Sequence, residues 1–151
     1  MEVKEAMVDN DQGHVDIDKI VKELKGKNKE KRLFYAFSPY VGLFVFRQQT
    51  MADVKASVEA VEKYVDEKIT SLGGHESVEK LPLEERNKIA RETDAEAGDI
   101  SNMGTLKSCV IYPETFAEAI DNDEVPSGVV PMLLEKIMEI SGWADVEITE
   151  V

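Results

Sequence analysis

Two short apolar runs decide the fold: Leu33-Phe34-Tyr35-Ala36-Phe37 and Leu43-Phe44-Val45-Phe46-Arg47, with Ser38-Pro39 and Gly42 between them. Aromatic and β-branched residues favour strands, and Ser, Pro and Gly favour the turn that joins them. The pattern predicts an antiparallel β-hairpin over about 33–47. It holds four of the five phenylalanines, so we expect it to anchor the core. A lone hairpin is marginal in water, so it must pack on helices or join another copy.

The segment after the hairpin carries the clearest helix signal. Thr50-x-x-Asp53 is close to a capping box, and Gly73-Gly74 offers a stop. Between them, apolar residues recur every three or four positions, as on one helix face: Val54, Val58, Val61, Val65 and Ile69. We expect a helix over about 51–70, followed by a polar loop over 73–81.

Three more helices are expected, over about 82–95, 99–111 and 128–141. Pro82 suits a first helical turn, and Gly98 is expected to break the pattern. The next helix should end near Tyr112, because proline disfavours helical conformation in the residue before it. Residues 114–120 can add one or two turns. The last helix has a wide apolar face, and Gly142 fits the position just past its end.

The N-terminal part is polar. Residues 1–15 lack periodicity and are expected to form a flexible tail, whereas Asp16 can cap a short helix through Leu24 that Gly26 ends. Residues 25–32 are expected to be a connector, and the closing alternation of Val146 and Ile148 with acids fits a short strand or an extended tail. Together these elements predict an α+β protein: a mostly helical single domain over 16–151, with a small antiparallel β-hairpin near the N-terminal side.

Composition narrows the function. The 151 residues include 31 acidic and 18 basic side chains, a formal net charge of -13, which opposes bulk binding of nucleic acid or anionic lipid. No apolar run is long enough to span a membrane, and the N-terminus lacks the order of a signal peptide, so we expect a soluble protein that is not secreted by that route. Charge is uneven: residues 19–32 carry seven basic and two acidic side chains, and residues 113–151 carry ten acids and one lysine. These regions are either two solvated faces or mutually attractive surfaces.

No catalytic chemistry is apparent. His14 and His75 have no second metal ligand nearby in sequence, and no nucleotide-binding, nucleophile-elbow or metalloprotease motif is present. Cys109 lies in an apolar helical context, which favours a buried structural thiol over a nucleophile. We therefore expect no catalytic residue, no metal and no cofactor.

A binding function is the remaining class, and two regions are candidates for it. Arg47 is the only basic residue within the aromatic strand pair, and it can form an internal salt bridge or contact a partner. The last helix can bury all of its apolar side chains, or can offer one side to a partner, as helix-in-groove recognition requires. The candidate partner-binding residues are Phe44, Phe46, Arg47, Leu133, Leu134, Ile137 and Met138.

Three stretches, in this order and spacing, resemble the small tail assembly chaperones of bacteriophages. They are Phe44-Val45-Phe46-Arg47-Gln48-Gln49-Thr50-Met51-Ala52-Asp53, Ser108-Cys109-Val110-Ile111-Tyr112-Pro113-Glu114 and Leu133-Leu134-Glu135-Lys136-Ile137-Met138-Glu139-Ile140-Ser141-Gly142-Trp143. The resemblance covers roughly residues 31–151. It does not include the basic segment before the hairpin or the polar insert over about 72–98, whose roles stay open.

The resemblance implies a non-catalytic protein of the host cytoplasm that keeps the tape measure protein, or another tail protein, soluble during tail assembly. Whether a shift of reading frame also yields a longer product, as the resemblance suggests, stays open. Homo-oligomers, client segment and stoichiometry stay open. Two alternatives remain: a structural component of the tail or baseplate, which would stay in the virion, and an acidic mimic of DNA that inhibits a host protein.

Overall fold

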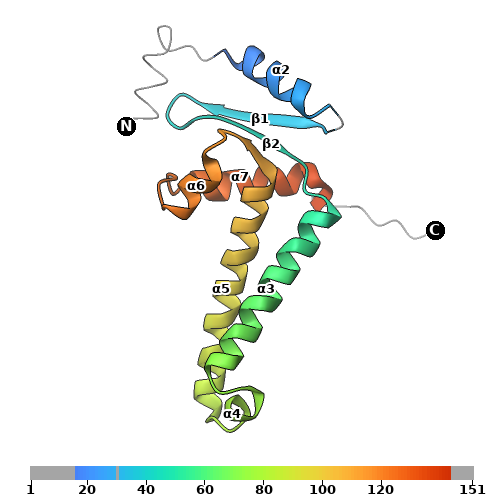
Figure 1. Ribbon diagram of the computed structural model, residues 1–151. Helices are drawn as coiled ribbons and strands as arrows, with labels where there is room; N and C mark the ends of the chain where they lie inside the picture. Colours follow the sequence, from blue (N-terminus) through green and yellow to red (C-terminus); the bar gives the residue numbers. More distant parts are fainter. Residues whose placement is uncertain (1–15, 30, 144–151) are drawn as a thin grey trace, which may run out of the picture. The chain divides into compact units, whose positions relative to one another are not determined.

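The computed structural model describes residues 16–29 and 31–143, in two compact units (Figure 1). Unit 1 combines Met1–Gln49 with Leu106–Val151, and unit 2 is Thr50–Thr105. We expected a single domain, but the middle of the chain makes its contacts mainly within itself. The predicted tail over 1–15 and the closing segment with Val146 and Ile148 lie outside the described residues.

Unit 1 is built on a three-stranded antiparallel sheet in the order β1-β2-β3. The predicted β-hairpin is confirmed: β1 (Leu33–Ser38) pairs with β2 (Gly42–Arg47), from Leu33 opposite Arg47 to Ser38 opposite Gly42. Strand β3 (Val110–Tyr112) pairs with the other edge of β2. Residues 110 and 111 were predicted to end a helix, and that prediction is wrong.

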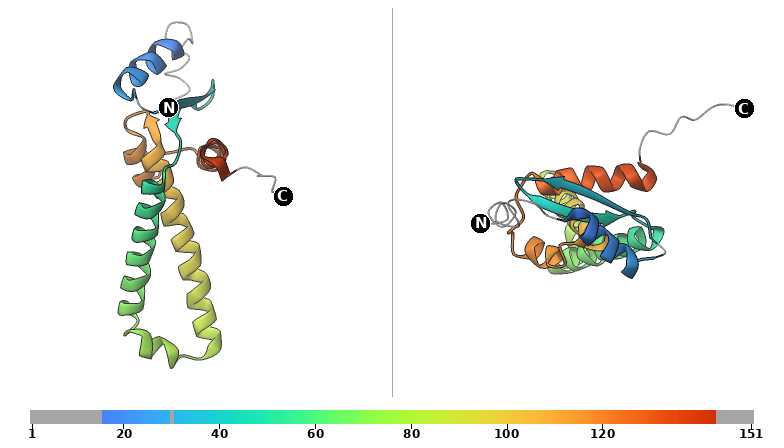
Figure 2. Two further views of the ribbon diagram at one scale, coloured as in Figure 1. Left: turned by 90° about the vertical axis from the view of Figure 1, so that its right-hand side faces the viewer. Right: turned by 90° about the horizontal axis from the view of Figure 1, so that it is seen from above.

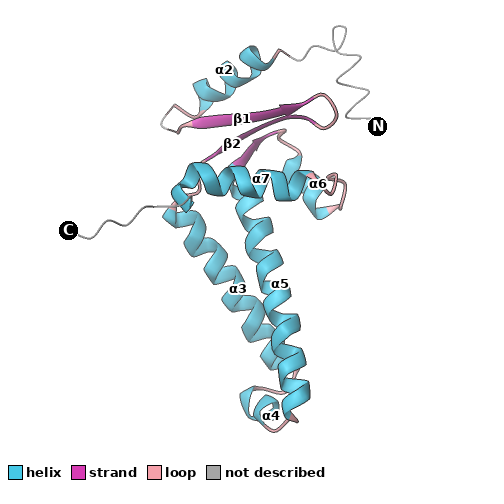
Figure 3. Ribbon diagram, turned by 180° about the vertical axis from the view of Figure 1, so that it is seen from behind, coloured by secondary structure: helices cyan, strands magenta, loops and turns pink. Residues whose placement is uncertain are grey.

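Helices cover both faces of this sheet (Figures 1 and 3). Helix α2 (Ile17–Lys27) lies on one side, and α6 (Phe116–Asp121) and α7 (Val129–Met138) lie on the other. Leu24 of α2 packs with Leu43 and Val45, whereas Phe44 meets Phe116 edge-on, with ring centroids 5.9 Å apart. Because both faces of β2 are covered, its residues form a continuous apolar run rather than an alternating one.

The helices of unit 1 begin and end within a few residues of the positions that the sequence predicted. Asp16 caps α2 as predicted, accepting a 3.0 Å hydrogen bond from the backbone N–H of Lys19. The helix continues through Gly26 to Lys27, where the side chain of Asn28 donates to the carbonyl of Leu24. After α7, a π-helical turn (Glu139–Trp143) contains Gly142 at φ 88°, so the backbone leaves right-handed helix at the predicted glycine.

Unit 2 is a helical hairpin (Figure 2). Helix α3 (Met51–Ser71) begins at the predicted capping box, in which Thr50 and Asp53 bond to each other's backbone N–H. Gly73 and Gly74, both with positive φ, end it. A short helix α4 (His75–Glu79) occupies the predicted polar loop and leads into α5 (Leu83–Cys109), whose last turn belongs to unit 1.

The expected break at Gly98 is wrong, because α5 continues through it as a single helix of 27 residues. A glycine inside a helix costs only about 1 kcal/mol relative to alanine. Ending one helix and starting another leaves up to four backbone N–H and four C=O groups without intrahelical partners. The continuous helix therefore has the lower free energy.

Candidate partner-binding surfaces

The aromatic residues predicted on β2 are core residues. Phe44 and Phe46 are both buried, and Phe46 stacks on Phe34 of the neighbouring strand with ring centroids 6.5 Å apart. Neither side chain is placed to touch a partner while unit 1 is folded. Their role is the anchoring of the core, which was also expected of the β-hairpin.

Arg47 ends β2 and is half-buried. One of its guanidinium N–H groups donates a 2.9 Å hydrogen bond to the backbone carbonyl of Gln48. Two further bonds join this end of the strand to the turn after α7. The Gln48 side-chain amide donates to the carbonyl of Ile140, and the Gln49 N–H donates to Ser141 Oγ. These contacts give the segment after β2 a structural role within unit 1.

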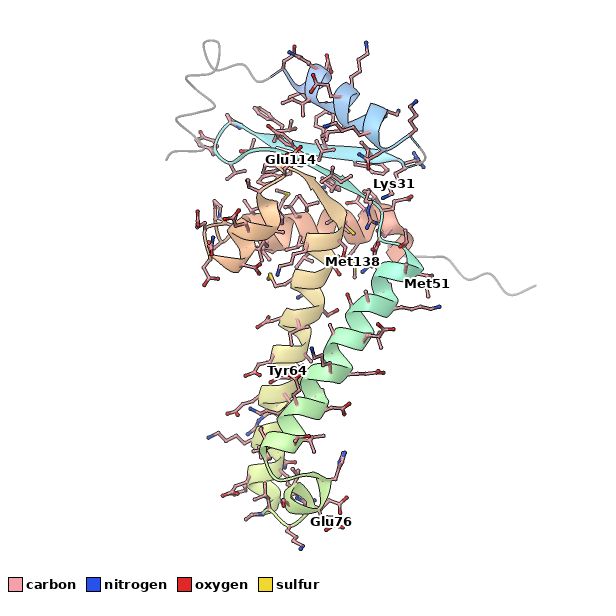
Figure 4. All side chains as sticks on the ribbon, viewed as in Figure 1. Lys31, Met51, Tyr64, Glu76, Glu114 and Met138 are labelled. Atoms are coloured by element: carbon pink, nitrogen blue, oxygen red, sulfur yellow. The ribbon has the colours of Figure 1, made fainter. Side chains whose placement is uncertain are left out.

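Helix α7 divides its apolar residues between core and surface. Leu133 and Ile137 are completely buried, and Val129 is almost completely buried. Leu134 is half-buried, and Met138 is 37% exposed (Figure 4). Two interpretations of this helix were open: all of its apolar side chains buried, or one side buried and another facing outward. The structure shows the second arrangement. Only Leu134 and Met138 of the predicted α7 residues could meet a partner.

Strand β1 brings aromatic side chains to the surface. It is an edge strand that pairs only with β2 among the described residues, and Tyr35, Phe37 and Tyr40 are exposed in and beside it. Tyr35 and Phe37 lie opposite Val45 and Leu43 in the register, and so share the sheet face that α2 covers elsewhere. The residues were visible in the sequence, but nothing there indicated which strand would be at the edge.

Unit 2 has the most open apolar surface. From Thr50 to Gly104 no residue is buried, although every one of them is described. The two long helices approach closely at one end, where a Cβ added to Gly104 would lie 3.3 Å from Ser57 Oγ. Elsewhere the apolar residues between them are half-buried, and Val58 is 49% exposed.

Four residues of α3 and the residue that caps its C-terminus form one stripe, which we call the α3 stripe: Val54, Val58, Val65, Ile69 and Leu72. At 100° per residue they fall within roughly 60° of one another around the helix axis. Val54, Val58, Val65 and Ile69 were predicted, together with Val61, to share one helix face. Local spacing did not show that α4 and α5 would leave four of the five stripe residues only half-buried and Val58 exposed.

A pocket of about 250 Å³ opens in unit 2, near α4. Val65, Ile69 and Leu72 of the α3 stripe line it, together with Val78 of α4 and Ile89 of α5. Two basic side chains, Lys68 and Arg86, also line it, and neither forms a salt bridge with any described residue. The pocket thus combines an apolar wall with unpaired positive charge.

Thr93 and Tyr64 add unpaired polar atoms to the same hairpin. The hydroxyl oxygen of each is shielded from solvent without a hydrogen-bond partner. Figure 4 shows Tyr64 midway along the hairpin, and Thr93 lines the pocket. A shielded hydroxyl without a partner is unfavourable, so the interior of unit 2 is less completely satisfied than that of unit 1.

Metal-binding and membrane-spanning features are absent from the described part of the chain. No group of three or more His, Cys, Asp or Glu side chains there could hold a metal ion. None of the described helices is both long and apolar enough to cross a bilayer. Cys109, expected to be a structural thiol, is completely buried.

Comparison with known proteins identifies no relative of this chain. No protein-family model matches the chain, and no match is found among curated proteins or among solved structures.

Proposed function

We propose that this protein is a non-catalytic chaperone that shelters apolar helical surface on another polypeptide. The observation that carries the proposal is the α3 stripe, an apolar helix face in a unit without a single buried residue between Thr50 and Gly104. Two antiparallel helices cover only one side of each other's apolar faces. A third helix laid along the stripe would cover what they leave open, by the packing that stabilises helical bundles.

The client that we propose is the tape measure protein of a bacteriophage tail, acting in the host cytoplasm. This identity rests on the resemblance of the three sequence stretches to tail assembly chaperones. A long helical protein with bare apolar faces tends to aggregate, and covering those faces removes the cause. The helical hairpin offers a surface of the right kind for that task.

Charge supports the same role. Residues 50–105 contain 13 acidic and seven basic side chains, and the whole chain has a net charge of -13. A client coated with several copies would therefore carry a large negative charge, and mutual repulsion would keep the coated chains dispersed. Each copy need bind only weakly, because contacts repeated along one client add up to a stable complex.

Co-expression with candidate tail proteins tests the proposal directly. We expect the tape measure protein to be recovered in the soluble fraction only when this protein is present. Purified virions provide the second measurement, because a chaperone should be absent from them. Finding the protein there in fixed copy number would instead establish a structural tail component, and the proposal would be wrong.

A substitution in the stripe tests which surface acts. Val58→Gln replaces an exposed apolar side chain of α3 with a polar one of good helix propensity. We expect it to change the free energy of unfolding by less than about 1 kcal/mol. It should nevertheless reduce the soluble fraction of the co-expressed client severalfold.

Ala60→Gln is the matched control for this variant. Ala60 is also exposed on α3, but it lies about 160° around the axis from Val58. It should solubilise the client as well as the unsubstituted protein does. Equal loss in both variants, or in neither, would show that the stripe is not the client surface.

A further inference from the structure

The pocket of unit 2 has the size for one large apolar side chain. Its volume is about 250 Å³, and a cavity of about 150 Å³ with an apolar lining is enough to bind benzene. Its apolar walls come from all three helices of the unit: Val65, Ile69, Leu72, Val78 and Ile89. A leucine, methionine or phenylalanine side chain would replace poorly packed space there with van der Waals contacts.

The charge at the pocket differs from that of its surroundings. Unit 2 has nearly twice as many acids as bases, yet the pocket is lined by Lys68 and Arg86 and by one acid, Asp94. Lys63 pairs with Glu67 one turn away, whereas the two cations at the pocket have no such partner among the described residues. An unpaired cation beside an apolar wall favours a ligand that is apolar with a carboxylate next to it.

Continuity with the α3 stripe indicates that this ligand belongs to a helix. Val65 and Ile69 are both pocket walls and members of the stripe, and Val58 lies on the same face about two to three turns earlier. From Val58 to Ile69 the stripe is about 16 Å long, the length of three helical turns. A free fatty acid could fill the pocket, but it would leave the rest of this stripe uncovered.

We propose that the pocket receives a single Leu, Met or Phe side chain from an amphipathic client helix, whose Asp or Glu one turn away pairs with Lys68 and Arg86. The proposal rests on the proposed function and specifies the sequence that the protein selects. An apolar anchor supplies contact area, and the acid next to it determines which way the helix lies. A helix with lysine in place of that acid would meet like charge and bind less well.

Synthetic peptides can test this with the full-length chain. The probe is an amphipathic peptide of about five helical turns, fluorescently labelled, with Leu at helical spacing and one Glu a turn from the central Leu. Three variants of the peptide replace the central Leu with Ala, the Glu with Gln, or the Glu with Lys. Fluorescence anisotropy measures binding. We expect the Leu→Ala peptide to bind about tenfold more weakly, and the Glu→Lys peptide to bind more weakly than the Glu→Gln peptide.

A second experiment fills the pocket by a substitution in the protein itself. Ala90 lines the pocket and is exposed, so Ala90→Met can occupy the space without displacing a core residue. We expect this variant to bind the parent peptide about ten times more weakly. Ala95→Met is the matched control, because Ala95 is exposed on α5 and does not line the pocket. Circular dichroism must show unchanged helicity, and Ala90→Leu replaces the first variant if it does not.

The charge is tested by a double variant, Lys68→Gln with Arg86→Gln. The double variant should bind the Glu peptide about three- to tenfold more weakly than the unsubstituted protein does. Its binding of the Gln peptide should be unchanged. Lys88→Gln, an exposed position of α5 outside the pocket, should have no effect on either peptide. Equal binding of the Glu and Lys peptides to the unsubstituted protein would overturn the charge assignment.

Two results would overturn the pocket proposal as a whole. One is undiminished peptide binding by folded Ala90→Met protein. The other is tight binding of dodecanoate with no binding of any peptide, which would make the pocket a site for a free amphiphile. The proposed function fails separately. If Val58→Gln abolishes client solubilisation and Ala90→Met does not, the chaperone role stands and only the pocket assignment is wrong.

Discussion

Gly98 lies inside α5 with φ in the usual negative range and open space around the position that a Cβ would occupy. Gly98→Ala is therefore expected to raise the free energy of unfolding by about 0.5–1 kcal/mol, because alanine loses less backbone entropy on folding. Thermal unfolding followed by circular dichroism measures it. If the helix instead broke at this residue, alanine would not stabilise the protein.

Gly73 is the contrasting residue. Its φ is +98°, and an added Cβ would lie 2.8 Å from Ser77 Oγ. Gly73→Ala should lower the free energy of unfolding by about 1–2 kcal/mol, through backbone strain and the clash with Ser77. The two glycines differ in conformation although both looked like helix stops in the sequence. Opposite signs for the two variants would confirm that difference.

Among the elements, α7 separates a core role from a binding role. Ile137 is completely buried and its neighbour Met138 is 37% exposed. Ile137→Ala is expected to destabilise the protein by about 2–5 kcal/mol, because it removes contacts that the surrounding residues cannot restore. Met138→Ala should cost less than about 1 kcal/mol. Urea unfolding curves of both variants check this, and similar losses would mean that both side chains are core.

The elements also differ in how far the sequence alone predicted them. The β-hairpin and α3 were predicted because their signals are local: a turn between two aromatic runs, and a capping box before a regular apolar stripe. Strand β3 was not predicted. Its three residues fit the end of a helix equally well, and only pairing with β2 at the Val45–Tyr112 and Phe46–Val110 positions decides for a strand.

For the whole molecule, the two units differ in burial. Among the described residues, every buried apolar residue belongs to unit 1, whereas the one buried residue of unit 2 is Thr105, at its last position. Stability against local opening follows buried contacts. Native-state hydrogen exchange is therefore expected to show amides of α3 exchanging faster than those of β2 by about a factor of ten or more.

A bound client should change that pattern. The helical peptide described above, at saturating concentration, should slow exchange along α3 and leave β2 unaffected, because binding stabilises only the elements it contacts. Protection in β2 instead would place the client on unit 1. Equal exchange rates in α3 and β2 without peptide would contradict the weak internal packing of the helical hairpin.

The amino-acid sequence by itself determined the α+β class, the β-hairpin, the start of α3 and the burial of Cys109, because each depends on residues close together in the chain. Tertiary structure decided the rest. Pairing with β2 makes 110–112 a strand, packing within unit 1 buries Ile137 and leaves Met138 outside, and unit 2 leaves the residues of the α3 stripe half-buried or, at Val58, exposed. An apolar stripe specifies that something must cover it, but only the arrangement of the chain shows whether the protein itself does so.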